Sequence, residues 1–325
     1  MELIKITRET GIPLVGHIAF GIIDRGSNLL QVRATTVCNL ACTFCSTAAG
    51  PEIHPANYEV EVDYLLDWVK EVVRLKECED IEINIDSAGE PTAYPELIKL
   101  VTELKKIKEI RFISMQTNGS LLDEKKIKDL EKAGLNRINL SIHAVDEELA
   151  KQLMGSKYYD LKKVEEVARV IVKTSIELNL TPVLLPGVNE KEMVKLIQFA
   201  KEIKCKIAIQ KYELYKYSRK EKKVKVQNWY KFYKQLEIWE KEFDMKLKYG
   251  PRDFKVYRTK KIPLIFQKGD ITIVEVRAKG WINGEVLAAA KNRAITLVNS
   301  QARIGDRVKV KMLDVSNSIY LAKKV

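Results

Sequence analysis

The chain has 325 residues, which is enough for one large hydrophobic core and a second, small domain. It has five cysteines, three of them within eight residues, and this argues against a disulfide-stabilised secreted protein. The first residues lack the pattern of a signal peptide and no apolar run is long enough to span a membrane, so we expect a cytoplasmic protein. Charged residues make up 31% of the chain, a share common in thermophile proteins.

The net charge of +12 is concentrated in one segment. Residues 211–261 contain 17 Lys and Arg against 7 Asp and Glu, together with 12 of the 25 aromatic residues. Cations can contact phosphates and flat rings can stack on unpaired bases, so this basic aromatic segment predicts binding to RNA. The alternative is a solvated helix whose aromatic residues pack inward.

Residues 1–28 are predicted to be an N-terminal extension, with a possible hairpin formed by 17–23 and 29–35 around Asp24. From residue 29 onward, strands alternate with helices, which predicts a parallel sheet in an α/β domain over 29–250. The predicted strands are 30–35, 81–86, 111–117, 137–143, 180–185 and 206–212, and the predicted helices lie near 61–76, 95–107, 123–133, 160–177 and 190–202.

The last part of the chain changes character. Residues 251–264 are predicted to be a linker, and 265–325 contain five short strands separated by tight turns. Such a pattern is typical of a small all-β barrel. These strands are predicted at 270–277, 284–289, 294–297, 307–312 and 319–322.

Three cysteines, Cys38, Cys42 and Cys45, follow the first predicted strand with the spacing C-x3-C-x2-C. Three thiolates in one loop can bind a [4Fe–4S] cluster and leave its fourth iron open. A zinc site would need a fourth ligand, for which His54 is the candidate. The spacing, with Phe44 before the last cysteine, resembles the radical S-adenosylmethionine (radical SAM) superfamily. That resemblance implies a partial (β/α)6 barrel whose open iron binds SAM and whose cluster cleaves it to a 5′-deoxyadenosyl radical.

Further motifs at predicted strand ends also resemble this superfamily. Ser87-Ala88-Gly89-Glu90-Pro91 is similar to its Gly-Gly-Glu-Pro motif, which implies that Glu90 or the adjacent carbonyls receive the SAM ammonium group. Ordinary turns are the alternative for these motifs, and Asn189 is predicted to cap the following helix. The residues implied as cofactor contacts are Phe44, Ala88, Gly89, Glu90, Asn118, Ser141, His143 and Val183.

No catalytic acid, base or thiol can be assigned from the sequence, because Cys78 and Cys205 are predicted to be structural. Gly305-Asp306-Arg307-Val308-Lys309-Val310 resembles the signature of TRAM domains, OB-like barrels that accompany many tRNA-modifying enzymes. We therefore expect a radical SAM enzyme that modifies an RNA nucleoside, with tRNA as the expected substrate. Its electron would come from an external donor such as ferredoxin or flavodoxin. The alternative is an enzyme acting on a small anionic metabolite or cofactor precursor.

Overall fold

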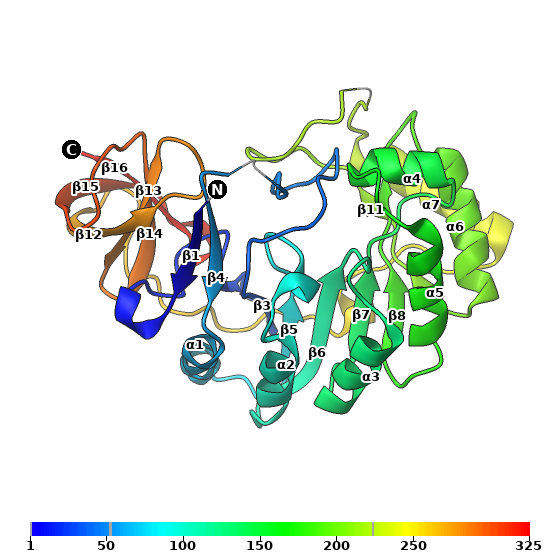
Figure 1. Ribbon diagram of the computed structural model, residues 1–325, viewed down its shortest axis with the longest axis horizontal. Coiled ribbons are helices and arrows are strands. Elements are labelled where there is room, and N and C mark those ends of the chain that lie inside the picture. The colour runs from blue at the N-terminus through cyan, green and yellow to red at the C-terminus, as the bar shows by residue number, and fades with distance from the viewer. Residues whose placement is uncertain (1, 52–53, 223) are drawn as a thin grey trace. The chain divides into compact units, whose positions relative to one another are not determined.

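The computed structural model describes residues 2–51, 54–222 and 224–325 (Figure 1). The chain divides into two compact units, and each is assembled from separate stretches of sequence. The first unit comprises Met1–Val37, Pro51–Ile113 and Tyr257–Val325, and the second comprises Cys38–Gly50 and Ser114–Val256. Among the described residues, no helix combines the length and apolar character needed to cross a membrane.

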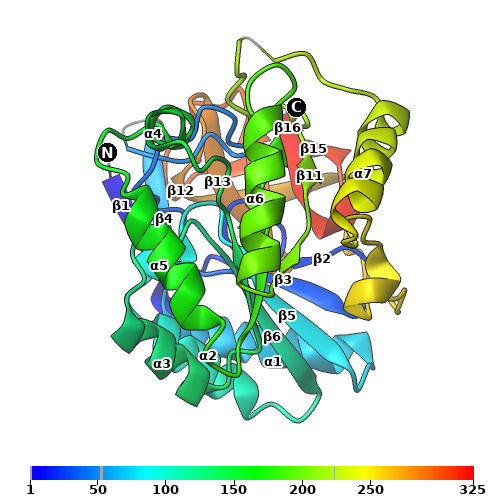
Figure 2. The ribbon, with the colours of Figure 1, turned by 90° about the vertical axis from the view of Figure 1, so that its right-hand side faces the viewer.

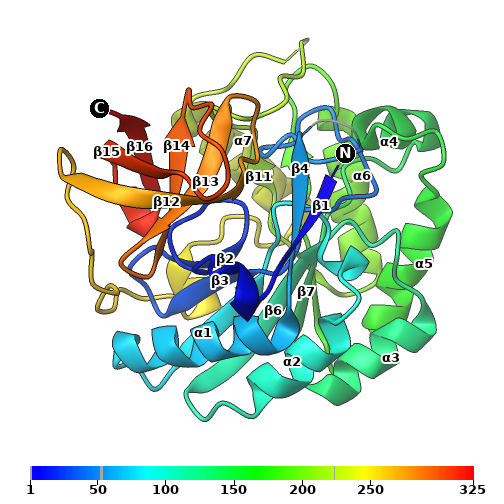
Figure 3. The same ribbon diagram turned by 60° about the vertical axis from the view of Figure 1, so that its left-hand side comes forward.

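In the first unit, short strands pair around a hairpin. Strand β2 (Gly21–Asp24) runs antiparallel to β3 (Leu29–Arg33), so the hairpin predicted around Asp24 is present. Strand β3 also pairs in parallel with β5 (Ile81–Ile85). Near the N-terminus, β1 (Glu2–Ile6) lies beside β4 (Ala56–Val60), again in parallel (Figure 3).

Helix α1 (Val62–Lys76) and helix α2 (Leu97–Lys105) complete this part of the first unit. Leu65, Val69 and Val72 recur at helical spacing and are buried, so α1 presents one apolar stripe to the core. Lys76, at the end of α1, is fully buried and its ammonium group lies 3.0 Å from the buried Asp24 carboxylate. It also donates to the Lys260 carbonyl at 2.6 Å, while the second carboxylate oxygen of Asp24 accepts from the Ile262 N–H at 2.8 Å.

Five strands near the C-terminus close into a barrel in the order β12-β13-β14-β16-β15, which confirms the predicted all-β barrel. Side chains alternate along the strands, so that Val308, Val310 and Met312 are buried while Lys309 and Lys311 are exposed. The strands are β12 (Ile271–Lys279), β13 (Glu285–Ala290), β14 (Arg293–Val298), β15 (Arg307–Asp314) and β16 (Tyr320–Lys324).

The second unit has a parallel core, in which β7 (Arg137–Leu140) pairs with the end of β6 (Ile110–Thr117) and with β8 (Glu177–Leu180). Strand β10 (Lys206–Ile207) adds to β8, and β9 (Val183–Leu184) pairs separately with β11 (Gln210–Lys211). The helices are α3 (Glu124–Ala133), α4 (Glu147–Met154), α5 (Leu161–Ile171), α6 (Glu190–Glu202) and α7 (Trp229–Phe243). Figure 2 shows α5 beside α6, where Arg169 and Glu202 form an ion pair at 2.8 Å.

Several details of the second unit differ from the predicted elements. The predicted strand 206–212 is divided into β10 and β11, and the predicted helix 160–177 ends at Ile171. The predicted strand 180–185 is divided into β8 and β9, because Pro182 between them has no N–H for a strand ladder. Helix α4 was not predicted, since eight residues carry little periodic signal. It begins after Asp146, whose carboxylate accepts a hydrogen bond from the Leu149 N–H at 2.8 Å.

Candidate active site

The cysteine loop, residues 38–50, is fastened to the C-terminal end of α4. The Ala41 and Thr43 N–H groups donate to the carbonyls of Met154 and Leu153 at 3.3 and 2.9 Å. Gly155 allows this approach, because a Cβ on it would lie 2.1 Å from the Ala41 carbonyl oxygen. Its φ of +62° lies in the left-handed region that favours glycine. The loop is therefore held by backbone contacts that do not depend on the thiols.

The three thiols of this loop affect one another electrostatically. The Cys45 N–H donates to the Cys42 carbonyl at 3.2 Å, so the two residues share one turn. Burial raises the pKa of the Cys42 thiol, repulsion from Cys45 and Cys38 raises it further, and the nearby Arg219 opposes both effects. Bare thiolates are costly in such a setting, whereas thiolates bound to iron are stabilised.

Phe44 and His143 are brought into contact. Their ring centroids are 4.6 Å apart at an interplanar angle of 74°. His143 Nδ1 accepts a hydrogen bond from the Val183 N–H at 3.0 Å, which places the imidazole proton on Nε2. Burial lowers the pKa of His143 to about 3, so the ring is neutral near pH 7. Three of the residues predicted from the sequence, Phe44, His143 and Val183, thus form one group beyond the end of β7 and at the start of β9.

Asn118 contacts the cysteine loop directly. Its side-chain amide donates to the Asn39 side-chain oxygen at 3.1 Å, and Asn39 in turn donates to the Ser120 hydroxyl at 2.9 Å. Asn118 was expected to contact SAM or merely to form a turn. Its observed contacts position the residue that follows Cys38, and no sequence pattern indicated that Asn39 takes part.

Ser141 belongs to a row of polar groups at the carboxyl ends of three strands. The Gln116 side-chain amide, on β6, donates to the Ser141 hydroxyl at 2.7 Å and to the Thr181 hydroxyl at 2.8 Å. Two residues before Ser141, on β7, the Asn139 side-chain oxygen accepts from the Asn179 amide at 3.0 Å. This row consists of neutral hydrogen-bonding groups, which suit the polar edges of an uncharged ring or a hydroxyl-bearing sugar.

In the first unit, the Ser87–Glu90 motif approaches the backbone just before Cys38. The Glu90 N–H donates to the Val37 carbonyl at 2.8 Å, and a Cβ on Gly89 would lie 2.2 Å from the same oxygen. Ser87 has a φ of +24°, and among the described residues its buried hydroxyl has no hydrogen-bond partner. The Glu90 carboxylate is 2% exposed and accepts from the Thr92 N–H and hydroxyl at 3.0 and 2.6 Å.

Comparison with known proteins shows the family to which a chain with this cysteine loop and these strand-end residues belongs. The family described as "Radical SAM superfamily" matches residues 32–200, which is more than half of the chain. The chain belongs to the radical SAM superfamily. An uncharacterized protein of Methanocaldococcus jannaschii is 39% identical over 97% of this chain and 79% of its own length.

Two other comparisons bear on parts of the radical SAM chain. A Methanosarcina mazei protein named "Probable GTP 3′,8-cyclase" is 30% identical over 57% of this chain, which spans only 54% of that relative. The structure of Streptococcus suis SuiB bound to S-adenosylmethionine has a TM-score of 0.51 and 18% identity, covering 75% of this chain and 52% of that one. This structural likeness shows the fold.

The cofactors of this radical SAM enzyme are a [4Fe–4S] cluster and SAM, and the residues present fit them. Cys38, Cys42 and Cys45 would hold the cluster, which binds each thiolate through a different iron. Among the described residues, no group of three or more His, Cys, Asp or Glu side chains is placed to hold a single metal ion. When bound, the cluster supplies the electron that splits SAM, giving a radical able to abstract hydrogen from an unreactive C–H bond.

Other residues considered from the sequence have different surroundings. His54 stacks on Trp281, with ring centroids 4.3 Å apart. Asn189 occupies the position before α6 but does not cap it, because its side-chain oxygen instead accepts from the Leu185 N–H at 2.7 Å. The amide nitrogen of the same buried side chain donates to the His143 and Val183 carbonyls at 3.0 Å each. Cys205 precedes β10, where burial raises the pKa of its thiol to about 12. An unreactive thiol of this kind agrees with a structural role.

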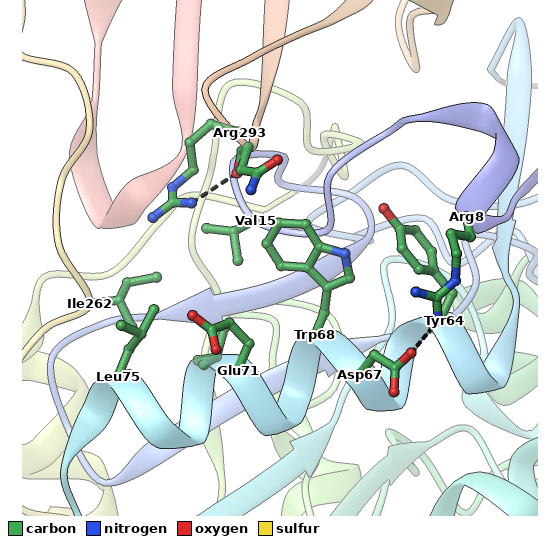
Figure 4. A pocket seen from close by; sticks show the side chains of 11 residues that line it. Arg8, Val15, Tyr64, Asp67, Trp68, Glu71, Leu75, Ile262 and Arg293 are labelled. Atoms are coloured by element: carbon green, nitrogen blue, oxygen red, sulfur yellow. Dashed lines mark hydrogen bonds and ion pairs between the residues drawn. The ribbon is translucent and has the colours of Figure 1, made fainter.

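The first unit also contains a cavity of about 260 Å³ beside α1 (Figure 4). Arg8 and Asp67 form an ion pair at one end of it, and Leu75 and Ile262 lie at the other end. Glu71 accepts two hydrogen bonds from Arg74, at 2.8 and 2.9 Å. Both carboxylates that line the cavity are thus paired with arginines.

Proposed function

We propose that this radical SAM enzyme modifies a nucleoside within RNA, with tRNA as the expected substrate. The observation that carries the proposal is a basic face on the closed barrel. Strand pairing places Ile271, Lys311 and Lys323 in one row across three strands, with Ile273 opposite Lys309 in the next. We call these five exposed residues the barrel face.

The barrel face combines charge with apolar surface. Ile271 and Ile273 are 57% and 54% exposed, which is unusual for isoleucine on a strand. Among the described residues, Lys309, Lys311 and Lys323 form no ion pair. Unpaired ammonium groups beside exposed apolar side chains suit phosphates together with sugar or base surface.

The basic aromatic segment supports the same proposal in the second unit. On α7, Phe232, Leu236 and Trp239 pack inward, as the alternative interpretation expected. Trp229 and Tyr230, however, are 52% and 76% exposed. Exposed rings next to cations can stack on bases that have left a helix, and a nucleoside must leave its helix to reach an enzyme's interior.

The residues at the strand ends would orient such a nucleoside and SAM. Gln116, Ser141 and Thr181 offer neutral polar groups, and the His143 Nε2–H is a donor that stays protonated near pH 7. Phe44 covers one side of His143 and helps to exclude water. An external electron donor such as ferredoxin or flavodoxin belongs to the same proposal.

The second candidate is a small nucleotide substrate. It is favoured by the relatives named GTP 3′,8-cyclase, although the chain spans about half the length of those it matches. The neutral polar row at the strand ends would suit a free nucleotide as well as one within RNA. The two candidates differ in what the barrel face must bind.

Salt dependence of tRNA binding tests the proposal. If the barrel face contacts phosphates, the slope of log K against log [salt] should become shallower by about 3 when K309Q, K311Q and K323Q are combined. The control combines K125Q, K128Q and K132Q on α3, which removes the same charge elsewhere. Equal slopes for the two triple variants would refute the barrel face as an RNA surface. Saturable binding of GTP without salt-dependent binding of tRNA would favour the second candidate.

A further inference from the structure

A turn in the basic aromatic segment contacts the cysteine loop from a distant part of the sequence. Residues 215–219, which we call the strap, lie between β11 and α7. The Ser218 hydroxyl accepts from the Tyr215 N–H at 2.9 Å, and the Ser218 N–H donates to the Tyr215 carbonyl at 3.1 Å. These two bonds fix the shape of the strap, and the Ser218 hydroxyl also lies 3.3 Å from the Ser46 carbonyl.

Arg219, the last residue of the strap, makes most of the contacts with the cysteine loop. Its N–H donates to the Cys45 carbonyl at 2.9 Å, and one terminal nitrogen donates to the Cys42 carbonyl at 2.8 Å. The other terminal nitrogen donates to the carbonyls of Ala48, at 3.1 Å, and Ala49. Four carbonyls, including those of two cysteines, are therefore bound by one residue.

The charge of Arg219 is not neutralised by an acid. Within the described residues its guanidinium forms no ion pair, and its side-chain hydrogen bonds go to backbone carbonyls of the cysteine loop. The side chain is half-buried, so solvent screens the charge only in part. A guanidinium held by several hydrogen bonds keeps one position, unlike a flexible lysine on the surface.

We propose that Arg219 is a positioning residue for the iron–sulfur site. Its hydrogen bonds fix the cysteine loop, and its positive charge makes the cluster easier to reduce. Reduction adds one electron, supplied by an external donor, and so adds one negative charge beside the Cys42 and Cys45 thiolates. A fixed positive charge nearby stabilises the reduced form more than the oxidised form. This inference goes beyond the choice of substrate and holds for either candidate function.

Three variants separate the two roles of Arg219. R219Q removes both the charge and the forked geometry, whereas R219K keeps the charge but cannot bind several carbonyls at once. K220Q is the matched control, because Lys220 is exposed and its replacement removes one positive charge from the neighbouring position. Far-ultraviolet circular dichroism and thermal unfolding of the apoproteins establish that each variant is folded.

The positioning role is measured without the cluster, by amide hydrogen exchange of residues 38–50 in the apoproteins. We expect exchange at least about tenfold faster in R219Q and R219K than in wild type, since a tenfold change corresponds to the loss of roughly one net hydrogen bond. K220Q should match wild type. Unchanged exchange in folded R219Q would overturn the positioning role.

The charge role is measured on reconstituted protein by an electron paramagnetic resonance redox titration. At one fixed potential we expect the ratio of reduced to oxidised cluster to fall about tenfold in R219Q, which is about 59 mV for a one-electron couple. R219K and K220Q should stay close to wild type. If R219Q does not take up iron, R219K tests the charge role. A tenfold lower ratio of reduced to oxidised cluster in R219K than in wild type would overturn that role, because R219K keeps the positive charge. A wild-type ratio in R219Q overturns the charge role directly.

Discussion

Replacing Lys76 by methionine should destabilise the first unit strongly. Lys76 and Asp24 both have side chains that are 0% exposed, and they form the ion pair at 3.0 Å. In K76M the Asp24 carboxylate would remain buried without a counter-charge, and the Lys260 carbonyl would lose its donor. Methionine has nearly the length of lysine, so the change tests the charge rather than the packing.

The structure sets the expected magnitude. Removing one partner of a buried ion pair costs about 3–5 kcal/mol. Asp24 would keep two backbone donors, from Gly26 and Ile262 at 2.8 Å each, and this places the cost near the lower end of that range. We therefore expect a loss of about 3 kcal/mol in the free energy of unfolding. Adding D24N should restore about 1 kcal/mol or more, because it removes the unpaired charge.

Urea unfolding of the apoproteins, followed by circular dichroism, measures these differences. K128M is the control, since Lys128 forms an exposed pair with Glu124 on α3 and should give no resolvable change. A loss below about 1 kcal/mol in K76M would refute the reasoning, because it would mean that the buried carboxylate finds other compensation. A double variant no more stable than K76M would do the same.

Three further variants address the candidate active site. C42S should abolish binding of iron and sulfide on anaerobic reconstitution, while C205S should retain both; iron bound normally by C42S would contradict the assigned ligands. If Glu90 receives the SAM ammonium group, as the family resemblance implies, E90Q should weaken SAM binding about tenfold in calorimetry of the cluster-loaded enzyme, and an unchanged Kd would rule that contact out. Burial lowers the pKa of His143 to about 3 from 6.5, so below pH 6.5 the unfolded chain binds a proton that the folded chain does not. Stability should therefore fall as the pH drops from 6.5 toward 3, by up to about 1.4 kcal/mol per pH unit, and H143Q should show a smaller slope in unfolding measured across this range; identical slopes would refute the assignment.

Local sequence patterns predicted much of the fold. Strand β5, helix α6 and the five barrel strands have compositions and turns that specify them without reference to distant residues. The cysteine loop was predictable for the same reason, because its three ligands lie within eight residues. The SAM contacts implied by the family resemblance, and the likeness of the barrel to TRAM domains, stay predictions.

Contacts between distant residues could not be predicted in the same way. Arg219 lies 177 residues from Cys42, and nothing in the composition of the basic aromatic segment singles it out from its other cations. Asn189 was expected to cap α6, as its position suggests, but its side-chain oxygen accepts from the Leu185 N–H and its amide donates to the His143 and Val183 carbonyls. Such roles depend on which backbone groups tertiary folding leaves without a partner.

The interleaved units have a consequence for biosynthesis. The first unit draws on residues up to 37, on 51–113 and again on 257 onward, so a ribosome must translate the second unit before the first can be completed. Until Lys260 and Ile262 emerge, Asp24 and Lys76 lack two of their partners. Domains usually fold in order of synthesis, N-terminal first, but here the stretch made first must wait. The residues of the second unit end at 256, so this unit is fully synthesised earlier. In nascent chains stalled beyond residue 256, we expect the second unit to become resistant to proteolysis before the first unit does.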